Sequence, residues 1–159
     1  MGLKVLSNKA IVKNKDKLFF VDKYYKPELP LNLTKHLLKF ANSSIDISDG
    51  LIDDLTKMIN KQSLSFHLFE NKIPVSNKLS NFIKKQRLNK INLISNGDDY
   101  QILFTADIKK ARIIQNASKA TGIKITKIGK IISGKGRSLI FNEKGKQIRA
   151  KSNGYIHRF

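Results

Sequence analysis

Along this chain, segments in which every second residue is apolar alternate with segments in which apolar residues recur every three or four positions. The first spacing is typical of a half-buried strand and the second of a helix with one buried face. The strand pattern covers residues 44–48, 64–68, 100–104, 124–132, 138–142 and 147–150. The helical pattern begins at Asn32 and again near Asp49 or Gly50, and it covers residues 77–86 and 107–121. This alternation predicts an α/β protein with a mixed α+β sandwich.

The first predicted helix has a clear start signal. Asn32 is the expected N-cap, and Leu33, Leu37, Leu38 and Ala41 would share the apolar face that follows it.

Three glycine-bearing segments are expected to end or reverse elements. Gly122 is a suitable residue to end the helix at 107–121. The turn at 142–145 would join the last two strands as a hairpin. The Gly-Lys-Gly run at 134–136 is too short a match for a phosphate loop, and we expect a hairpin turn there as well.

The composition excludes several classes of protein. The chain has 159 residues, of which 40% are apolar, enough for one domain with a sizeable core. It contains no cysteine, so a disulfide framework and a thiolate metal site are both excluded. No apolar run approaches the roughly 18–20 residues that span a bilayer, and the first residues show no signal-peptide core. We therefore expect a cytoplasmic protein without a membrane partner.

The formal charge of +19 is the strongest compositional signal. A chain this basic often binds nucleic acid or an acidic membrane surface. However, 26 of the 31 basic residues are lysine, and they are spread along the whole chain. Proteins that read phosphates and bases favour the bidentate fork of arginine. Compositional bias is therefore the preferred explanation, and nucleic acid is not the expected partner.

Half of the 12 acidic residues fall in two short clusters, which is unexpected in so basic a chain. Clustered carboxylates repel one another unless a cation, a helix N-terminus or basic neighbours offset the repulsion. Oxygen ligands of this kind suit Mg²⁺, which typically takes one or two carboxylates together with substrate phosphates. The clusters are Asp46, Asp49, Asp53 and Asp54 in the first and Asp98 and Asp99 in the second.

A purely structural explanation accounts for the same residues. Ser48 or Asp49 could cap the following helix, while Asp53 and Asp54 complement its dipole. The second cluster could lie in a turn before a strand. A strand, loop and helix carrying Ser, Gly and Asp would equally serve a nucleotide phosphate at the helix N-terminus. The pattern alone leaves both explanations open.

Four segments, in order along the chain, resemble the motifs of one enzyme family. Residues 45–51, with Asp54 and Leu55 behind them, resemble the IDISDGL…DL signature of thiamine-monophosphate kinases. Residues 96–104 resemble the family's GGEDYELLF segment, residues 123–136 resemble its TxIGxI…GxG stretch, and residues 154–157 are similar to its terminal G-aromatic-x-H-F. Ahead of the first signature, residues 24–28 resemble its R-Y-x-x-P segment. Together these segments extend over nearly the whole chain.

The resemblance implies the fold of the C-terminal domain shared with aminoimidazole ribonucleotide synthetase, selenophosphate synthetase and a hydrogenase maturation enzyme. It also implies transfer of the γ-phosphoryl group of ATP to thiamine monophosphate, giving thiamine diphosphate. The acceptor phosphate oxygen is already anionic near neutral pH. No catalytic side chain is therefore expected, and catalysis would rest on positioning and on Mg²⁺.

Roles for individual residues follow from the motif positions. By resemblance, Asp46 and Asp49 would ligate Mg²⁺, Ser48 would contact ATP, and Asp98 and Tyr155 would contact the thiamine substrate.

Three positions depart from the family motifs: Asn96, Asp98 and Arg158, of which Arg158 interrupts the usual ending. Asn96 and Asp98 stand where the family usually has Gly and Glu. Asp98 is one methylene shorter than glutamate, and Asn96 adopts a left-handed conformation less easily than glycine.

The resemblance also predicts the domain organisation. Family members begin with a further domain that carries most metal ligands and the nucleotide phosphate site. Residues 1–30 are therefore expected to be a leading segment that follows a missing N-terminal ATP-binding domain, and residues 31–159 to be the synthetase-like C-terminal domain. The expected partners are thiamine monophosphate and ATP, together with a separate N-terminal half or a second copy in a homodimer. The competing hypothesis is a non-catalytic truncated remnant or polyanion-binding module with the same fold.

Overall fold

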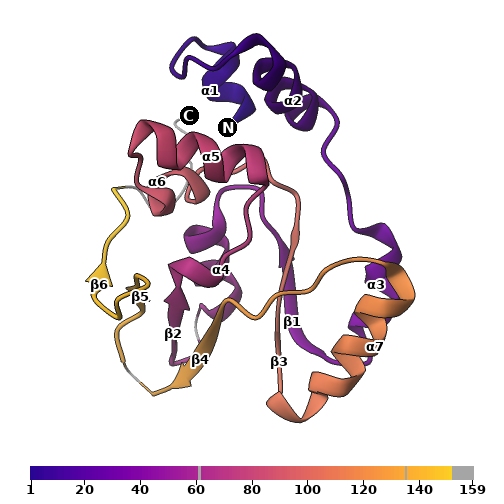
Figure 1. Cartoon of the computed structure of the whole chain (residues 1–159). Coiled ribbons are helices and arrows are strands. Elements are labelled where there is room, and N and C mark those ends of the chain that lie inside the picture. The colour runs from indigo at the N-terminus through magenta and orange to yellow at the C-terminus, as the bar shows by residue number, and fades with distance from the viewer. Residues whose placement is uncertain (61, 135, 152–159) are drawn as a thin grey trace, which may run out of the picture.

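The computed structural model describes residues 1–60, 62–134 and 136–151, and Figure 1 shows how their elements are arranged. The helices are α1 (Gly2–Leu6), α2 (Asn14–Tyr25), α3 (Leu31–Leu37), α4 (Leu51–Ile59), α5 (Asn77–Gln86), α6 (Lys90–Ile94) and α7 (Ala111–Thr121), with 3-10 turns η1 (Glu70–Lys72) and η2 (Ile108–Lys110). The strands are β1 (Ala41–Asp46), β2 (Leu64–Phe69), β3 (Ile102–Ala106), β4 (Gly129–Ser133), β5 (Leu139–Phe141) and β6 (Gln147–Ile148). No helix within the described ranges is long and apolar enough to cross a membrane.

The strands form two separate sheets. β1 and β3 pair antiparallel as a two-stranded ribbon, and the other four strands follow the order β4-β2-β5-β6. Within the larger sheet β2 and β5 run parallel, whereas the β2–β4 and β5–β6 pairs are antiparallel. The combination of helices with sheets of mixed direction confirms the predicted fold class.

The prediction of a hairpin turn at residues 134–136 is wrong. β4 and β5 lie on opposite sides of β2, so the chain between them crosses to the far side of that strand. Glycine spacing signals a change of direction, but it does not show which strand the chain joins next.

The hairpin predicted at the end of the chain is confirmed. β5 and β6 pair antiparallel, with Ile140 opposite Ile148. Asn142 Oδ1 accepts hydrogen bonds from the N–H groups of Lys144 and Lys146, at 3.0 and 2.9 Å. This side chain therefore stabilises the turn in the way that asparagine favours.

The larger of two apolar cores joins α4 to both sheets. α4 contributes five buried apolar residues, at positions 51, 52, 55, 58 and 59, and this spacing places them on one helix face. Leu68 of β2, Ile91 of α6 and Leu103 of β3 are buried against the same cluster. A smaller core of Leu33, Phe40 and Ala117 lies between α3 and α7, on the right of Figure 1.

The first predicted helix ends earlier in the structure than its apolar spacing indicates. α3 ends at Leu37, its N-cap is Pro30 rather than Asn32, and Ala41 already begins β1. Leu38 is 94% exposed, while Phe40 fills the core instead. The strand pairing of β1 with β3 thus overrides the helical spacing beyond residue 37.

The leading segment contains two helices that were not expected. α1 and α2 contact each other, and α2 lies against α5 through the rings of Phe20 and Phe82, 6.4 Å apart. Lys78 of α5 also forms an ion pair with Asp16 of α2. These contacts tie residues 1–30 to the remainder of the chain, and the proposed division at residue 30 stays a prediction.

Other predicted elements differ mainly at their ends. α5 has the bounds predicted, with Ser76 accepting from the N–H of Leu79 as N-cap, and Gly122 ends α7 at φ 68°. α7 begins only at residue 111, because the preceding residues form η2, which the Asp107 side chain caps. β3 has the predicted length but lies two residues further along the chain, and β4 is shorter than predicted. The five-residue α6 is too short for its periodicity to be recognised.

We predict that Ile91→Ala lowers the free energy of unfolding by about 3 kcal/mol, because Ile91 is completely buried in the larger core. Urea unfolding followed by circular dichroism measures this loss. Leu38→Ala, at a 94% exposed position, is the control and should change stability by less than about 0.5 kcal/mol. Equal losses in the two variants would contradict the core as described.

Candidate functional site

The first acidic cluster lies where β1 passes through a short loop into α4. The N-cap of α4 is Gly50, which has no side chain to accept a hydrogen bond. Instead Asp54, which is 1% exposed, turns one carboxylate oxygen back towards the loop. Its Oδ2 accepts from the N–H groups of Ser48, Asp49 and Gly50, each at 3.0 Å. Neither Ser48 nor Asp49 is therefore the N-cap that the structural explanation assumed.

The second acidic segment is hydrogen-bonded directly to this loop. The N–H of Asp98 donates to the carbonyl of Ser48, and the N–H of Tyr100 donates to the carbonyl of Ile47, both at 2.9 Å. The N–H of Ile47 donates in return to the carbonyl of Gln101 at 2.9 Å. These bonds continue the β1–β3 ladder beyond its last strand pair. The predicted ATP contact Ser48 and the predicted substrate contact Asp98 are thus neighbours.

The backbone at this junction is tightly constrained. Asp98 and Tyr100 have positive φ angles of 68° and 50°, a region that non-glycine residues rarely adopt. At Gly97 the constraint is space, because a Cβ atom there would lie 1.7 Å from the carbonyl oxygen of Ser48. The close approach of the two loops therefore requires glycine at position 97.

Three carboxylates of the first cluster surround one ammonium group. Lys57 Nζ pairs with Asp49 Oδ2, lies 2.7 Å from Asp53 Oδ2 and lies 3.4 Å from Asp54 Oδ1. The hydrogen bond to Asp49, followed by the one to Asp53, raises the pKa of the Lys57 ammonium above its ordinary value. Lys57 therefore stays protonated.

The same carboxylates have the donor chemistry of a divalent-cation site. Asp49, Asp53 and Asp54 each offer one oxygen, and these oxygens lie within 4.8 Å of one another. Hard oxygen donors at this separation fit Mg²⁺. Of the two residues predicted to ligate Mg²⁺, Asp49 belongs to this group. Asp46 lies outside it, exposed at the end of β1 and opposite Ile102 of β3.

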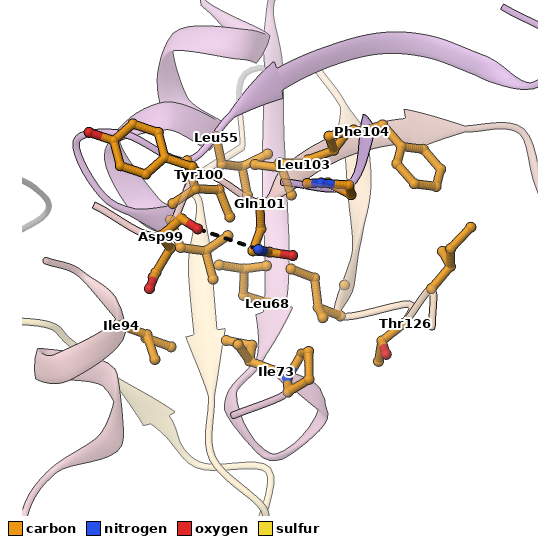
Figure 2. A pocket seen from close by; sticks show the side chains of 18 of the residues that line it. Leu55, Leu68, Ile73, Ile94, Asp99, Tyr100, Gln101, Leu103, Phe104 and Thr126 are labelled. Atoms are coloured by element: carbon orange, nitrogen blue, oxygen red, sulfur yellow. Dashed lines mark hydrogen bonds between the residues drawn. The ribbon is translucent and has the colours of Figure 1, made fainter. Parts of the chain in front are cut away.

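A cavity of about 2010 Å³ opens beside the two loops, and Figure 2 shows part of its lining. Ser48, Asp49 and Asp98 line it at the loop end, and Leu68 and Leu103 belong to its apolar walls. Ser48, Asp49 and Asp98 therefore face a common space that also extends over apolar side chains.

Asp99 and Gln101 add polar groups to that space. Partial desolvation by the surrounding protein, opposed in part by nearby positive charge, raises the pKa of the Asp99 carboxyl above its usual value, although the residue keeps an exposed surface. Gln101 Nε2 donates to the carbonyl of Glu28 at 2.9 Å and to the carbonyl of Asp99 at 3.4 Å, the latter drawn as a dashed line in Figure 2. Gln101 thus connects the second acidic segment to the leading segment of the chain.

Sequence reasoning missed the roles of two residues. Lys57 follows Asp53 by four positions and Asp54 by three, a helical spacing that brings side chains together and could have indicated the ion pairs. Asp54 was expected only to complement the helix dipole, and no local signal shows that it accepts three backbone bonds. Tyr155, predicted to contact the thiamine substrate, lies outside the described residues.

Comparisons with known proteins point to one family. No protein-family model matches the chain. A thiamine-monophosphate kinase of Buchnera aphidicola subsp. Schizaphis graminum is 36% identical to it over 159 residues, covering 98% of this chain and 48% of that relative. The thiamine-monophosphate kinase of Escherichia coli (strain K12) is 27% identical over 157 residues. The chain spans about half the length of the curated relatives it matches.

A solved structure agrees with these relatives. AaThiL complexed with AMPPCP and TMP is similar to the chain with a TM-score of 0.72 and 27% identity. The match covers 98% of this chain and 47% of that one. The fold described above is therefore that of half of such a protein.

We predict that Asp54→Asn lowers the free energy of unfolding by about 2 kcal/mol, because three charge-assisted hydrogen bonds become weaker neutral ones. The control is Asp53→Asn, which weakens one exposed ion pair and should cost less than about 1 kcal/mol. Urea unfolding of both variants measures the difference. A larger loss for Asp53→Asn would show that Asp54 does not anchor the loop.

We predict that Gly97→Ala destabilises the chain by about 3 kcal/mol, since the new methyl group collides with the Ser48 carbonyl. Gly122→Ala is the matched control: its Cβ meets open space, and only the positive φ of 68° opposes it, at about 1 kcal/mol. Thermal and urea unfolding measure the stability loss of each variant. The comparison distinguishes the cost of the steric collision at Gly97 from the cost of backbone strain at Gly122. If Gly97→Ala is as stable as the parent chain, the loops do not lie as close as described.

Proposed function

The chain belongs to the thiamine-monophosphate kinase family, and we propose that it forms the C-terminal half of an enzyme that transfers the γ-phosphoryl group of ATP to thiamine monophosphate. In this reaction a phosphate oxygen of thiamine monophosphate forms a bond to the γ-phosphorus. The bond from that phosphorus to the bridging oxygen of ADP breaks, and the products are ADP and thiamine diphosphate. Because ATP is the phosphoryl donor, we place the reaction in the cytoplasm.

The hydrogen bond between the Ser48 carbonyl and the Asp98 N–H, at 2.9 Å, carries the proposal. By resemblance Ser48 contacts ATP and Asp98 contacts the thiamine substrate. A direct bond between their backbones brings the donor and acceptor sites together, as in-line transfer requires. The co-ligands AMPPCP and TMP of the similar AaThiL structure are of the kind that this pair of sites would hold.

The acceptor needs little chemical activation, so the residues act by positioning. The Asp54 carboxylate fixes the backbone of residues 48–50, which holds Ser48 in place. Asp98 is fixed by its bond to Ser48, and its shorter side chain would approach the thiamine substrate less far than the glutamate usual in the family. Tyr155 is proposed as a further substrate contact from its motif position.

Mg²⁺ is the proposed cofactor, and bound at this site it would neutralise charge on the transferred phosphoryl group. Of the two predicted ligands, Asp49 is the better placed to hold it, since its oxygen belongs to the group of three within 4.8 Å. Asp46 remains a proposed ligand from its motif position.

The relatives are about twice as long as this chain, so we propose that the reaction also needs the other half of such a kinase. We propose a separate N-terminal half as the partner of this chain. A homodimer of two copies of the chain is the other proposed assembly.

The test is formation of thiamine diphosphate from thiamine monophosphate, ATP and Mg²⁺. We would assay this chain alone, mixed with the N-terminal half of the E. coli relative, and fused to that half. We predict turnover only when the second half is present, and a loss of at least about 100-fold in kcat on Asp49→Asn.

Asp22→Asn, at an exposed aspartate of α2, is the matched control and should leave turnover unchanged. An absence of product in both the mixture and the fusion would reject the catalytic proposal in favour of a non-catalytic fold. Full activity of Asp49→Asn would reject the role of that carboxylate.

A further inference from the structure

Lys57 occupies the position among the acidic side chains that a cation would take. Its ammonium group contacts carboxylate oxygens of Asp49, Asp53 and Asp54, which are also the three residues of the candidate cation site. Among the described residues no other lysine is recorded in ion pairs with more than one carboxylate. This arrangement is therefore specific to position 57.

Helix geometry explains how a single lysine reaches all three. Side chains of an α-helix lean towards its N-terminus, and residues three and four positions apart lie on the same face. Lys57 follows Asp54 by three positions and Asp53 by four, so its side chain extends back over the first turn of α4 towards Asp49. The ammonium thus lies at the N-terminal end of the helix.

This position has an electrostatic reason as well. Three carboxylates close together repel one another unless a cation lies among them. One ammonium offsets only part of their charge, which leaves the group attractive to a divalent ion. The charge of Lys57, however, repels any cation that approaches the same oxygens.

We infer that Lys57 is a resident cation of this acidic group and competes with the divalent ion for the Asp49 and Asp53 carboxylates, so that it weakens binding of the ion. The inference rests on the proposed function, which supplies the ion, but it assigns a role to a residue that the family motif does not include.

The side chain is suited to exchange. Lys57 is 47% exposed, and its flexible stem allows the ammonium to move into water without disturbing the helix. Asp54 differs, since its Oδ2 already accepts three backbone bonds and is 2% exposed as a side chain. The ion would therefore take the oxygens that Lys57 releases, while the Asp54 contacts to the loop remain.

The test measures binding of Mn²⁺ alone to the full chain, from the loss of the free-ion signal in electron paramagnetic resonance. Lys57→Gln should bind Mn²⁺ about tenfold more tightly than the parent chain, because one positive charge leaves the immediate surroundings of the site. Lys57→Arg keeps the charge and should bind like the parent. Lys119→Gln removes a charge from the exposed last turn of α7 and should change the affinity less than about twofold.

Thermal unfolding provides a second readout that does not depend on activity. In EDTA, Lys57→Gln should unfold at a lower temperature than the parent, because its three carboxylates lack a cation. Saturating Mn²⁺ should raise the unfolding temperature of Lys57→Gln more than that of the parent, since an ion that binds the folded state more tightly stabilises it more.

The outcomes separate the two proposals. Equal Mn²⁺ affinity in the parent, Lys57→Gln and Lys57→Arg would overturn the competition while leaving the metal part of the proposed function in place. Weaker binding by Lys57→Gln would overturn it as well, since the lysine would then support the ion. Failure of both the parent and Lys57→Gln to bind Mn²⁺ would overturn the inference and the metal site together.

Discussion

One buried carboxylate organises the part of the molecule on which the site depends. The loop between β1 and α4 has three N–H groups that point to one place, and Asp54 Oδ2 accepts all of them. A buried charge is tolerated only when it is well hydrogen-bonded, and these three donors provide that. The bond between the Ser48 carbonyl and Asp98 in turn requires the loop to hold this shape.

Charge is distributed unevenly in this protein. The chain carries a formal charge of +19, yet the acidic residues of the site are gathered at one end of the β1–β3 ribbon. The excess of lysine has a local use there, because Lys57 lies among the carboxylates themselves. An overall basic composition therefore says little about the chemistry of the site, which depends on the few positions where opposite charges meet.

Features set by neighbouring residues could be predicted from the sequence, and features set by distant ones could not. The bounds of α5, the glycine end of α7 and the last hairpin follow from local spacing and turn chemistry. The early end of α3 depends on pairing with β3, and the position of β5 beside β2 depends on sheet order. In the site, the acidic segments could be located, whereas the inward turn of Asp54 and the contacts of Lys57 required the three-dimensional structure.

The β1–β3 ribbon also determines when during folding the site can exist. Asp46 is paired with Ile102, and the chain between them forms α4, β2, α5 and α6. Contacts between positions so far apart in the sequence form slowly, because the intervening loop must lose conformational entropy before the pairing stabilises it. On the ribosome, the segment that carries Asp54 is therefore synthesised well before residues 97–100 can reach it. The two halves of the site come together only after β3 has been synthesised.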